Sequence, residues 1–584
     1  MPAFRTLFDD FFDEFVAIDP VSATNIGDHR HDHRWPDATP DGRAANAAFV
    51  ERWLATFEGL DPGSLTPDEA IDRDLIVLEL EAERFGLTEL QEDAWDPLGW
   101  VYLVGAGLFP LIALEFAPLA ARLDRVAGRL AGMPALLDAA RERLVGTADR
   151  PVARFHTETA LDQLSGVTGL IDEARAAAEA AASSDPAAVD VRARLEAAAA
   201  LAIAAVDDFE RHLRDEVLPR SEGEGRLGAD LFARKMRHTM RSDALTPDRI
   251  LADAERQFEM VRAEMVRLAT ESWPTWRPDV PRPADEAALV RGVLDAIADE
   301  HQEADALLAF CRAENARIEA FCRERDLIGM ADEPMDIRWT PEFLRATAGA
   351  MLIAPGPLDK GLETFFAITP MPDDWSAERR ESYLREDNDR MLRLLTIHEA
   401  VPGHYLQAVY ANRVASLPRA IFSSGLFAEG WAVYVTQVMM DVGYGSDDPG
   451  LLLTHWKFYL RSITNAIIDA RIHIHGMTEA EAVEFMVNGG FQEEAEARAK
   501  YDRARLTSTQ LSTYFAGSVE MWDIELEARR RAATDAGADP GSVVARELPG
   551  GFGVTPGFRY RPHLESVIGH GAPPTSLLRR MLWR

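Results

Sequence analysis

The sequence contains little cysteine. Its 584 residues include two cysteines, Cys311 and Cys322, which are expected in one helix. Eleven residues of helix place them about 16 Å apart along the axis, too far for a disulfide. The chain therefore has no disulfide framework. Because it begins with acidic and aromatic residues and not with a basic, apolar leader, we expect a cytoplasmic protein.

Long apolar runs are also missing. The stretch from Trp100 to Leu114 is free of charged residues, but it has only 15 residues and contains Gly105, Gly107 and Pro110. A helix that crosses a bilayer needs about 20 mainly apolar residues. We therefore expect no membrane-spanning helix.

Positive charge is scarce as well. The chain has 97 acidic residues against 62 basic ones, a formal net charge of −35. Such a charge repels phosphate backbones and anionic lipid surfaces, so we expect neither nucleic acid nor a membrane as a partner. With 47% hydrophobic and 27% charged residues, the composition is that of a globular protein with a sizeable core.

Helical periodicity dominates the sequence. From about Phe4 to Asp326 apolar residues recur at steps of three and four, which predicts helices. Three short β-favouring segments then follow at 336–339, 350–353 and 364–368, which predict a small sheet. Helical periodicity resumes near Ser376. We predict a mainly α fold, with a helical body over 1–330 and a second part over 331–584, joined as one continuous fold.

The stretch LLTIHEAVPGHYLQ, residues 394–407, carries the most chemical information. His398 and Glu399 are followed by His404, six residues after the first histidine. Histidines four apart on a helix differ by about 40° and can face one ion, whereas histidines six apart differ by about 240°. A straight helix would therefore point the two rings in different directions.

Pro402 and Gly403 lie between the two histidines and resolve this conflict. A proline inside a helix has no N–H, and its ring clashes with the carbonyl four residues earlier, here that of His398. Gly403 can adopt the dihedrals that a bulge requires. We therefore expect the helix to open at 401–403, so that His404 returns to the face occupied by His398.

A catalytic zinc ion takes three protein ligands and keeps one open position. Glu429, in the apolar segment LFAEGWAVYVT at 426–436, is the candidate third ligand beside His398 and His404. A carboxylate buried among apolar residues needs a charged partner, which Zn2+ would supply. Glu399, on the neighbouring side of the first helix, is placed to accept a proton from the attacking water as general base.

Several motifs resemble one known family. HEAVPGH followed by EGW, the early segment 19–37, DARIH at 469–473 and QLSTYFAG at 510–517 are similar to motifs of the bacterial family catalogued as domain of unknown function 885. That family resembles zinc peptidases of the gluzincin kind. The resemblance implies a zincin-like helical body with a deep cleft, one wall of it formed by 1–330. It also implies a substrate-edge strand before the motif helix, and action on short peptides.

The same resemblance adds two candidate catalytic residues. Tyr514 could donate its phenolic O–H, and His473 an imidazole N–H, to the oxyanion of a tetrahedral intermediate. The alternative is a buried tyrosine and a core histidine that is hydrogen-bonded to Asp469.

Taken together, these observations predict a zinc metallopeptidase that hydrolyses amide bonds in short peptides. Two alternatives remain, namely a zinc hydrolase of a non-peptide amide and a catalytically silent helical protein in which zinc is only a structural staple. The cluster His29, His31 and His33 could indicate a second metal site. However, charged residues alternate with these histidines, and we interpret the segment as an ion-paired surface loop. We assign no role to His563 or His570.

Overall fold

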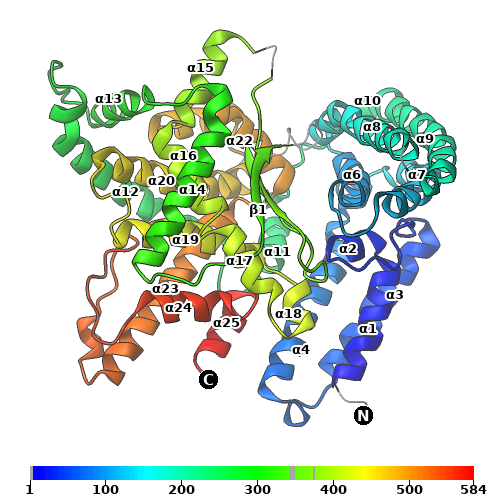
Figure 1. The fold of residues 1–584 in the computed structure, drawn as a ribbon, viewed down its shortest axis with the longest axis horizontal. Helices are drawn as coiled ribbons and strands as arrows, with labels where there is room; N and C mark the ends of the chain where they lie inside the picture. The colour runs from blue at the N-terminus through cyan, green and yellow to red at the C-terminus, as the bar shows by residue number, and fades with distance from the viewer. Residues whose placement is uncertain (1–3, 184, 341–348, 373–374) are drawn as a thin grey trace. The chain divides into compact units, whose positions relative to one another are not determined.

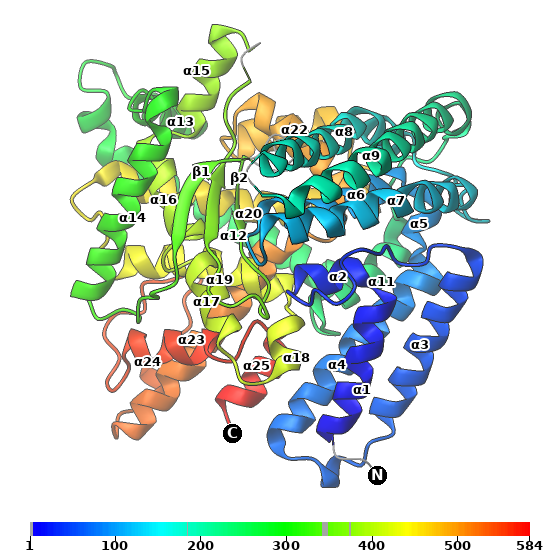
Figure 2. The same cartoon turned by 45° about the vertical axis from the view of Figure 1, so that its right-hand side comes forward.

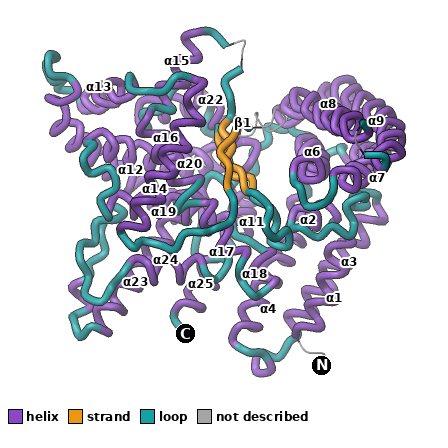
Figure 3. Tube along the Cα trace, viewed as in Figure 1, coloured by secondary structure: helices purple, strands orange, loops and turns teal. Residues whose placement is uncertain are grey.

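The computed structural model describes residues 4–183, 185–340, 349–372 and 375–584. Helices and connecting loops make up nearly all of this part of the chain, and the strands form one small patch (Figure 3). The mainly α prediction is confirmed, and so is the small sheet. The predicted strands at 350–353 and 364–368 agree with the observed ones, and the first begins one residue early, at Met335.

The chain divides into two compact units. The first contains residues up to Gly225 together with the described parts of Thr340–Gly349 and Ala354–Thr364, and the second contains the rest. This division differs from the one drawn at residue 330 from the sequence. The helices between Arg226 and Glu324 pack mainly with elements of the second unit, for example α12 (Pro247–Trp276) with α20 (Pro449–His475) and α14 (Leu307–Glu324) with α16 (Asp389–Glu399).

The first unit consists of helices. These are α1 (Phe4–Ile18), α2 (Pro20–Asn25), α3 (Pro40–Glu58), α4 (Pro67–Phe85), α5 (Glu92–Trp95), α6 (Pro97–Ala113), α7 (Leu119–Arg143), α8 (Arg154–Ala182), α9 (Ala187–His212) and α10 (Leu218–Arg220). Buried Phe11 joins α1 to α3, since its ring contacts Phe49, Trp53 and Phe57. Within the described ranges no single helix is long and apolar enough to cross a membrane, although the bent pair Pro67–Trp95 and Pro97–Ala113 meets the length and composition criteria.

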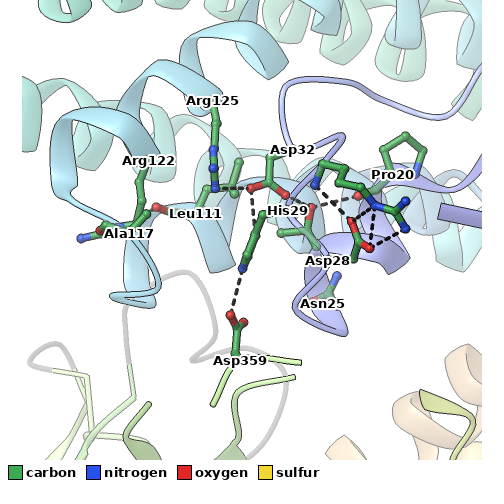
Figure 4. Close-up of polar contacts among 12 residues, drawn as sticks. Pro20, Asn25, Asp28, His29, Asp32, Leu111, Ala117, Arg122, Arg125 and Asp359 are labelled. Carbon is green, nitrogen blue, oxygen red and sulfur yellow. Dashed lines mark hydrogen bonds and ion pairs between the residues drawn. The ribbon is translucent and has the colours of Figure 1, made fainter. Parts of the chain in front are cut away.

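His29 connects two distant segments of this unit. Its Nδ1 lies 2.9 Å from Asp32 Oδ2 and its Nε2 lies 2.9 Å from Asp359 Oδ1 (Figure 4). The ring stacks on Phe116, with centroids 3.6 Å apart. Arg125 also pairs with Asp32, at 2.8 Å. The segment is therefore ion-paired as expected, but it is not wholly a surface loop, because Asp32 is buried.

The second unit contains the remaining helices and the sheet, except for Thr364 at the start of the last strand. The helices are α11 (Gly228–Met240), α12, α13 (Glu286–Ala298), α14, α15 (Ala377–Glu386), α16, α17 (His404–Asn412), α18 (Leu417–Ile421), α19 (Gly425–Asp441), α20, α21 (Glu479–Glu484), α22 (Glu494–Thr507), α23 (Ser512–Asp535), α24 (Tyr560–Ile568) and α25 (Thr575–Leu582). Helix α20 is buried along most of its length, and α12, α16, α19, α22 and α23 pack around it (Figure 1).

The sheet packs against the helix that carries the first histidine. Its strands are β1 (Met335–Trp339), β2 (Ala350–Ile353) and β3 (Thr364–Ile368), in the order β1-β3-β2. β2 and β3 are antiparallel, with Ala350 opposite Ile368. Apolar residues of β1 and β3 share one buried cluster with residues of α14, α15 and α16, and Figure 2 shows the sheet beside α14 and α16. The cluster therefore fixes the position of α16 from one side.

Helices α19 and α23 cross with their backbones in contact. A Cβ atom added to Gly517 would lie 2.1 Å from the carbonyl oxygen of Leu426, and one added to Gly430 would lie 2.3 Å from the carbonyl carbon of Gly517. Only glycine permits this approach. Glu429 directly precedes Gly430, and Tyr514 lies one helical turn before Gly517. The crossing therefore brings the Glu429 and Tyr514 side chains together.

We predict that Gly517→Ala lowers the free energy of unfolding by about 3 kcal/mol or more, because the methyl group must push two backbones apart. The control is Gly169→Ala in α8, where an added Cβ has no atom within 4 Å and the change should be neutral or slightly stabilising. Urea denaturation of both variants measures the difference. Equal stability of Gly517→Ala and the wild type would contradict the close crossing.

A second prediction concerns pH. Burial lowers the pKa of His29, but its hydrogen bonds to Asp32 and Asp359 raise it more, to about 9. A folded-state pKa above the ordinary value of 6.5 stabilises the fold fully below about pH 6.5, and this contribution is lost as pH rises through about 9. We expect the free energy of unfolding to fall by roughly 1–3 kcal/mol across this window.

Denaturation curves at pH 6.5, 8 and 9.5 test this expectation. His29→Asn should remove most of the decline, whereas His33→Asn, at an exposed position of the same segment, should leave it unchanged. A decline of the same size in His29→Asn would assign the pH dependence to another group.

Candidate metal centre

A break between α16 and α17 brings two histidines together. α16 ends at Glu399 and α17 begins at His404. Across the break, the N–H of Gly403 donates to the carbonyl of Ile397, six residues back, at 3.0 Å. A regular α-helix bonds four residues back, so two extra residues are accommodated and the spacing of six acts as a spacing of four. The two imidazole rings lie 4.7 Å apart between centroids, at 83°, and the predicted opening of the helix is confirmed.

The loop that forms the break is buried and held in place. Trp431 of α19 donates its indole N–H to the carbonyl oxygen of Pro402, at 2.9 Å. A Cβ on Gly403 would lie 1.9 Å from the carbonyl oxygen of His398. The φ of Gly403 is −73°, so glycine is needed here for space and not for a left-handed conformation.

Glu429 of α19 completes a group of three side chains that could hold a metal ion. Its Oε2 lies 3.4 Å from Nε2 of His404 and 3.8 Å from Nε2 of His398. One ligand atom from each of the three residues lies within 4.8 Å of the others. The structure thus brings together the three residues that the sequence predicted as metal ligands.

Two of the three side chains are in the charge state that binds a cation. Burial lowers the pKa of His398 to about 3, and the charge of His404 lowers it as well, so the His398 imidazole is neutral and can act as a ligand. Burial raises the pKa of Glu429, but His404 and His398 lower it more, so its carboxyl is ionised. Burial lowers the pKa of His404, but the hydrogen bond and charge of Glu429 raise it more, so a cation that binds here would displace the proton of this imidazole.

Two buried polar atoms of the group, His398 Nδ1 and Glu429 Oε2, have no hydrogen-bond partner among the described residues. A buried carboxylate oxygen without a partner is costly. Two imidazoles and one carboxylate are the donor set of many catalytic zinc sites, and a cation between the three side chains would satisfy this oxygen.

Glu399 lies at the end of α16, next to the group. Its side chain is buried, with 7% exposure, and within the described part of the chain it makes no hydrogen bond or ion pair. Burial raises its pKa to about 7. A carboxylate with a pKa in this range can both accept and release a proton near neutral pH.

Tyr514 of α23 also lies beside the group. Its ring is nearly parallel to that of His398, with centroids 6.5 Å apart. Arg503 of α22 donates to the phenolic oxygen at 3.1 Å and to Oε1 of Gln510 at 3.1 Å. Burial raises the pKa of Tyr514 above its ordinary value, and the charge of Glu429 raises it as well. The phenol therefore keeps its proton and can donate it in a hydrogen bond.

His473 does not belong to this site. Its Nδ1 accepts the N–H of Leu227 at 3.2 Å, and its Nε2 lies 2.9 Å from the carbonyl oxygen of Ala504. Both ring nitrogens are thus occupied by main-chain groups, so the predicted role in binding an oxyanion was wrong. The expected bond to Asp469 was also wrong, because that carboxylate accepts hydrogen bonds from Thr509 and Ser512.

Sequence reasoning missed two residues near the group. Arg503 is one, and Phe458 of α20, whose ring meets the His398 ring edge to face at 5.6 Å, is the other. Neither belongs to a recognisable motif. Phe458 lies on α20, a helix buried along most of its length, and no sequence signal separated it from the other apolar residues there.

Two solved structures are similar to this chain along nearly its whole length. A protein of unknown function from Shewanella oneidensis, described as a lipoprotein, is 29% identical, with a TM-score of 0.81 and 100% of both chains covered. A protein from Colwellia psychrerythraea, also described as a lipoprotein, is 15% identical, with a TM-score of 0.79 over 99% of this chain and 98% of that one, and shares the fold. No curated protein matches the chain. The model of the family described as "Bacterial protein of unknown function (DUF885)" matches residues 20–552, and the chain belongs to this family.

Proposed function

We propose that this protein is a zinc-dependent hydrolase that cleaves amide bonds in short peptides. The observation that carries the proposal is the convergence of His398, His404 and Glu429, with ligand atoms within 4.8 Å of one another, beside the buried and unpartnered carboxylate of Glu399. A site that only held a structural ion would have no need for that carboxylate, which costs free energy when it is buried alone.

Each residue has a separate role in this proposal. His398, His404 and Glu429 hold Zn2+, which when bound polarises a carbonyl group and makes water a stronger acid. Glu399 accepts a proton from the attacking water and transfers it to the leaving amine. Tyr514 donates its O–H to the carbonyl oxygen as negative charge develops there, and Arg503 orients the phenol.

The proposal includes a zincin-like arrangement of the active site. In that arrangement a substrate would lie in a cleft and pair with a strand edge next to the motif helix. β1 and β2 are both edge strands. β2 suits this role because all its residues are partly exposed, whereas β1 has one buried residue and central β3 is buried throughout. Backbone pairing recognises any extended peptide, which favours peptides over a non-peptide amide as the substrate.

We predict that Glu399→Gln binds zinc as the wild type does but hydrolyses peptides about 100- to 10,000-fold more slowly, because the amide cannot accept the proton. Turnover is measured with a library of quenched fluorescent peptides, with and without a chelator. Glu378→Gln, at an exposed position of α15, is the control and should keep full activity. Full activity in Glu399→Gln would remove the general-base role.

We predict that His398→Ala loses most of its bound zinc, because two ligands do not hold the ion as three do. Elemental analysis after dialysis measures the zinc content. The matched control is His455→Gln on α20, another buried histidine, whose Nε2 bonds to Gln437 at 2.8 Å. It should retain close to one zinc ion per chain. Zinc content that is the same in both variants would contradict the ligand assignment.

A further inference from the structure

Arg503 is a cation without an acidic partner. Its Nη2 donates to Tyr514 and to Gln510, both neutral side chains. Among the described residues no carboxylate lies within salt-bridge distance of it, and Nε and Nη1 make no hydrogen bond. Neither nitrogen is among the buried side-chain atoms that lack a hydrogen-bond partner. Arg503 therefore presents free, charged donors beside the candidate metal centre.

The neighbouring cations behave differently. Lys457 pairs with Glu386 at 2.8 Å, Arg461 pairs with Glu386 and Glu496, and Lys500 lies 3.6 Å from Glu496. These buried charges are therefore neutralised within the protein, as burial requires. Arg503 is also partly buried, but among the described residues it makes no ion pair, and the acidic group that acts on its charge is Glu429 of the candidate metal centre.

We infer that Arg503 binds the C-terminal carboxylate of the peptide substrate and so directs cleavage to the C-terminal end of the chain. This inference rests on the proposed function and names its substrate class. A guanidinium is the side chain best suited to a carboxylate, because its N–H groups match the two oxygens in one plane. The nitrogens Nε and Nη1, left free by Tyr514 and Gln510, offer donors for such a pair.

The position of Arg503 agrees with this role. Its Nη2 is 3.1 Å from the Tyr514 oxygen, and the Tyr514 ring is 6.5 Å from the His398 ring between centroids. One tyrosine side chain thus separates the guanidinium from the candidate metal centre. An extended peptide advances about 3.5 Å per residue, so a carboxylate held by Arg503 places one of the last peptide bonds at the metal.

A role limited to orienting Tyr514 would need only the Nη2 donor. Gln510 already holds this nitrogen through its Oε1, at 3.1 Å. A role in orienting Tyr514 does not explain the Nε and Nη1 donors of Arg503 or the absence of an ion pair to its guanidinium. Both features are explained if these donors bind an anionic group of the substrate.

The test measures binding in a variant whose turnover is expected to be strongly reduced. Zinc-loaded Glu399→Gln is titrated calorimetrically with acetyl-Ala-Ala-Ala and with its C-terminal amide. We expect the free carboxylate to bind about 10- to 100-fold more tightly than the amide, as for a charge-assisted pair. Adding Arg503→Met should abolish this preference and leave binding of the amide unchanged. Arg503→Lys, which keeps the charge but loses the planar pair, should retain a smaller preference.

The matched control is Arg498→Met, on the same helix, whose guanidinium is exposed and already paired with Glu479 and Glu494. It should retain the full preference. Equal affinity of the parent variant for the acid and the amide would overturn the inference. An equal loss of affinity for both peptides in Arg503→Met would also overturn it, because Arg503 would then act only as a positioning residue. The first comparison needs no variant of Arg503, so it can overturn the inference even if Arg503→Met does not fold, and Arg503→Lys is the second variant that assigns a preference to Arg503.

The same titration on the metal-free wild type separates this inference from the proposed function. Suppose that the wild type fails to take up zinc and to cleave peptides, yet still prefers the free carboxylate over the amide. This result would refute the proposed hydrolase and support carboxylate binding by Arg503. Cleavage of internal bonds, at the same rate in peptide acids and amides, would support the hydrolase and refute the inference.

Discussion

Two residues added to a helical turn determine where the second histidine of the site points. The hydrogen bond from Gly403 to Ile397 spans six residues, and it turns His404 to the face of His398. The added turn is possible because Pro402 has no N–H to contribute and Gly403 has no Cβ to collide with the carbonyl of His398. Trp431 then fixes the loop from α19, the helix that supplies Glu429.

A second backbone approach places the groups around the ligands. Because α19 and α23 meet at Gly430 and Gly517, Glu429 and Tyr514 are held side by side on two helices that cannot be moved apart without losing buried contacts. A rigid crossing of this kind is what a catalytic site needs, because small displacements of a positioned group weaken catalysis strongly. Gly403, Gly430 and Gly517 thus allow the close backbone approaches, and the proposed function assigns the chemistry to the polar residues beside them.

Buried charges in this unit fall into two groups. Most are neutralised by a partner, as Lys457 is by Glu386. Among the described residues Glu399 and Arg503 make no ion pair, and Oε2 of Glu429 faces the imidazoles of His404 and His398 at 3.4 and 3.8 Å. All three side chains lie around the candidate metal centre. Burial of a charge costs free energy, and in the proposed function a bound cation and an anionic substrate would offset part of this cost.

The sequence by itself determined the local features. The mainly helical class, the three short strands and the break at Pro402 follow from periodicity and from the missing proline N–H. The candidate ligands His398, His404 and Glu429 follow from side-chain chemistry and from the apolar neighbours of Glu429. Only the tertiary structure decided the long-range ones. In the folded chain both ring nitrogens of His473 contact main-chain groups. The first compact unit ends its main segment at Gly225, and Arg503 donates a hydrogen bond to Tyr514. These outcomes depend on which helix faces meet, and that is set by packing between segments far apart in the chain, which no local pattern records.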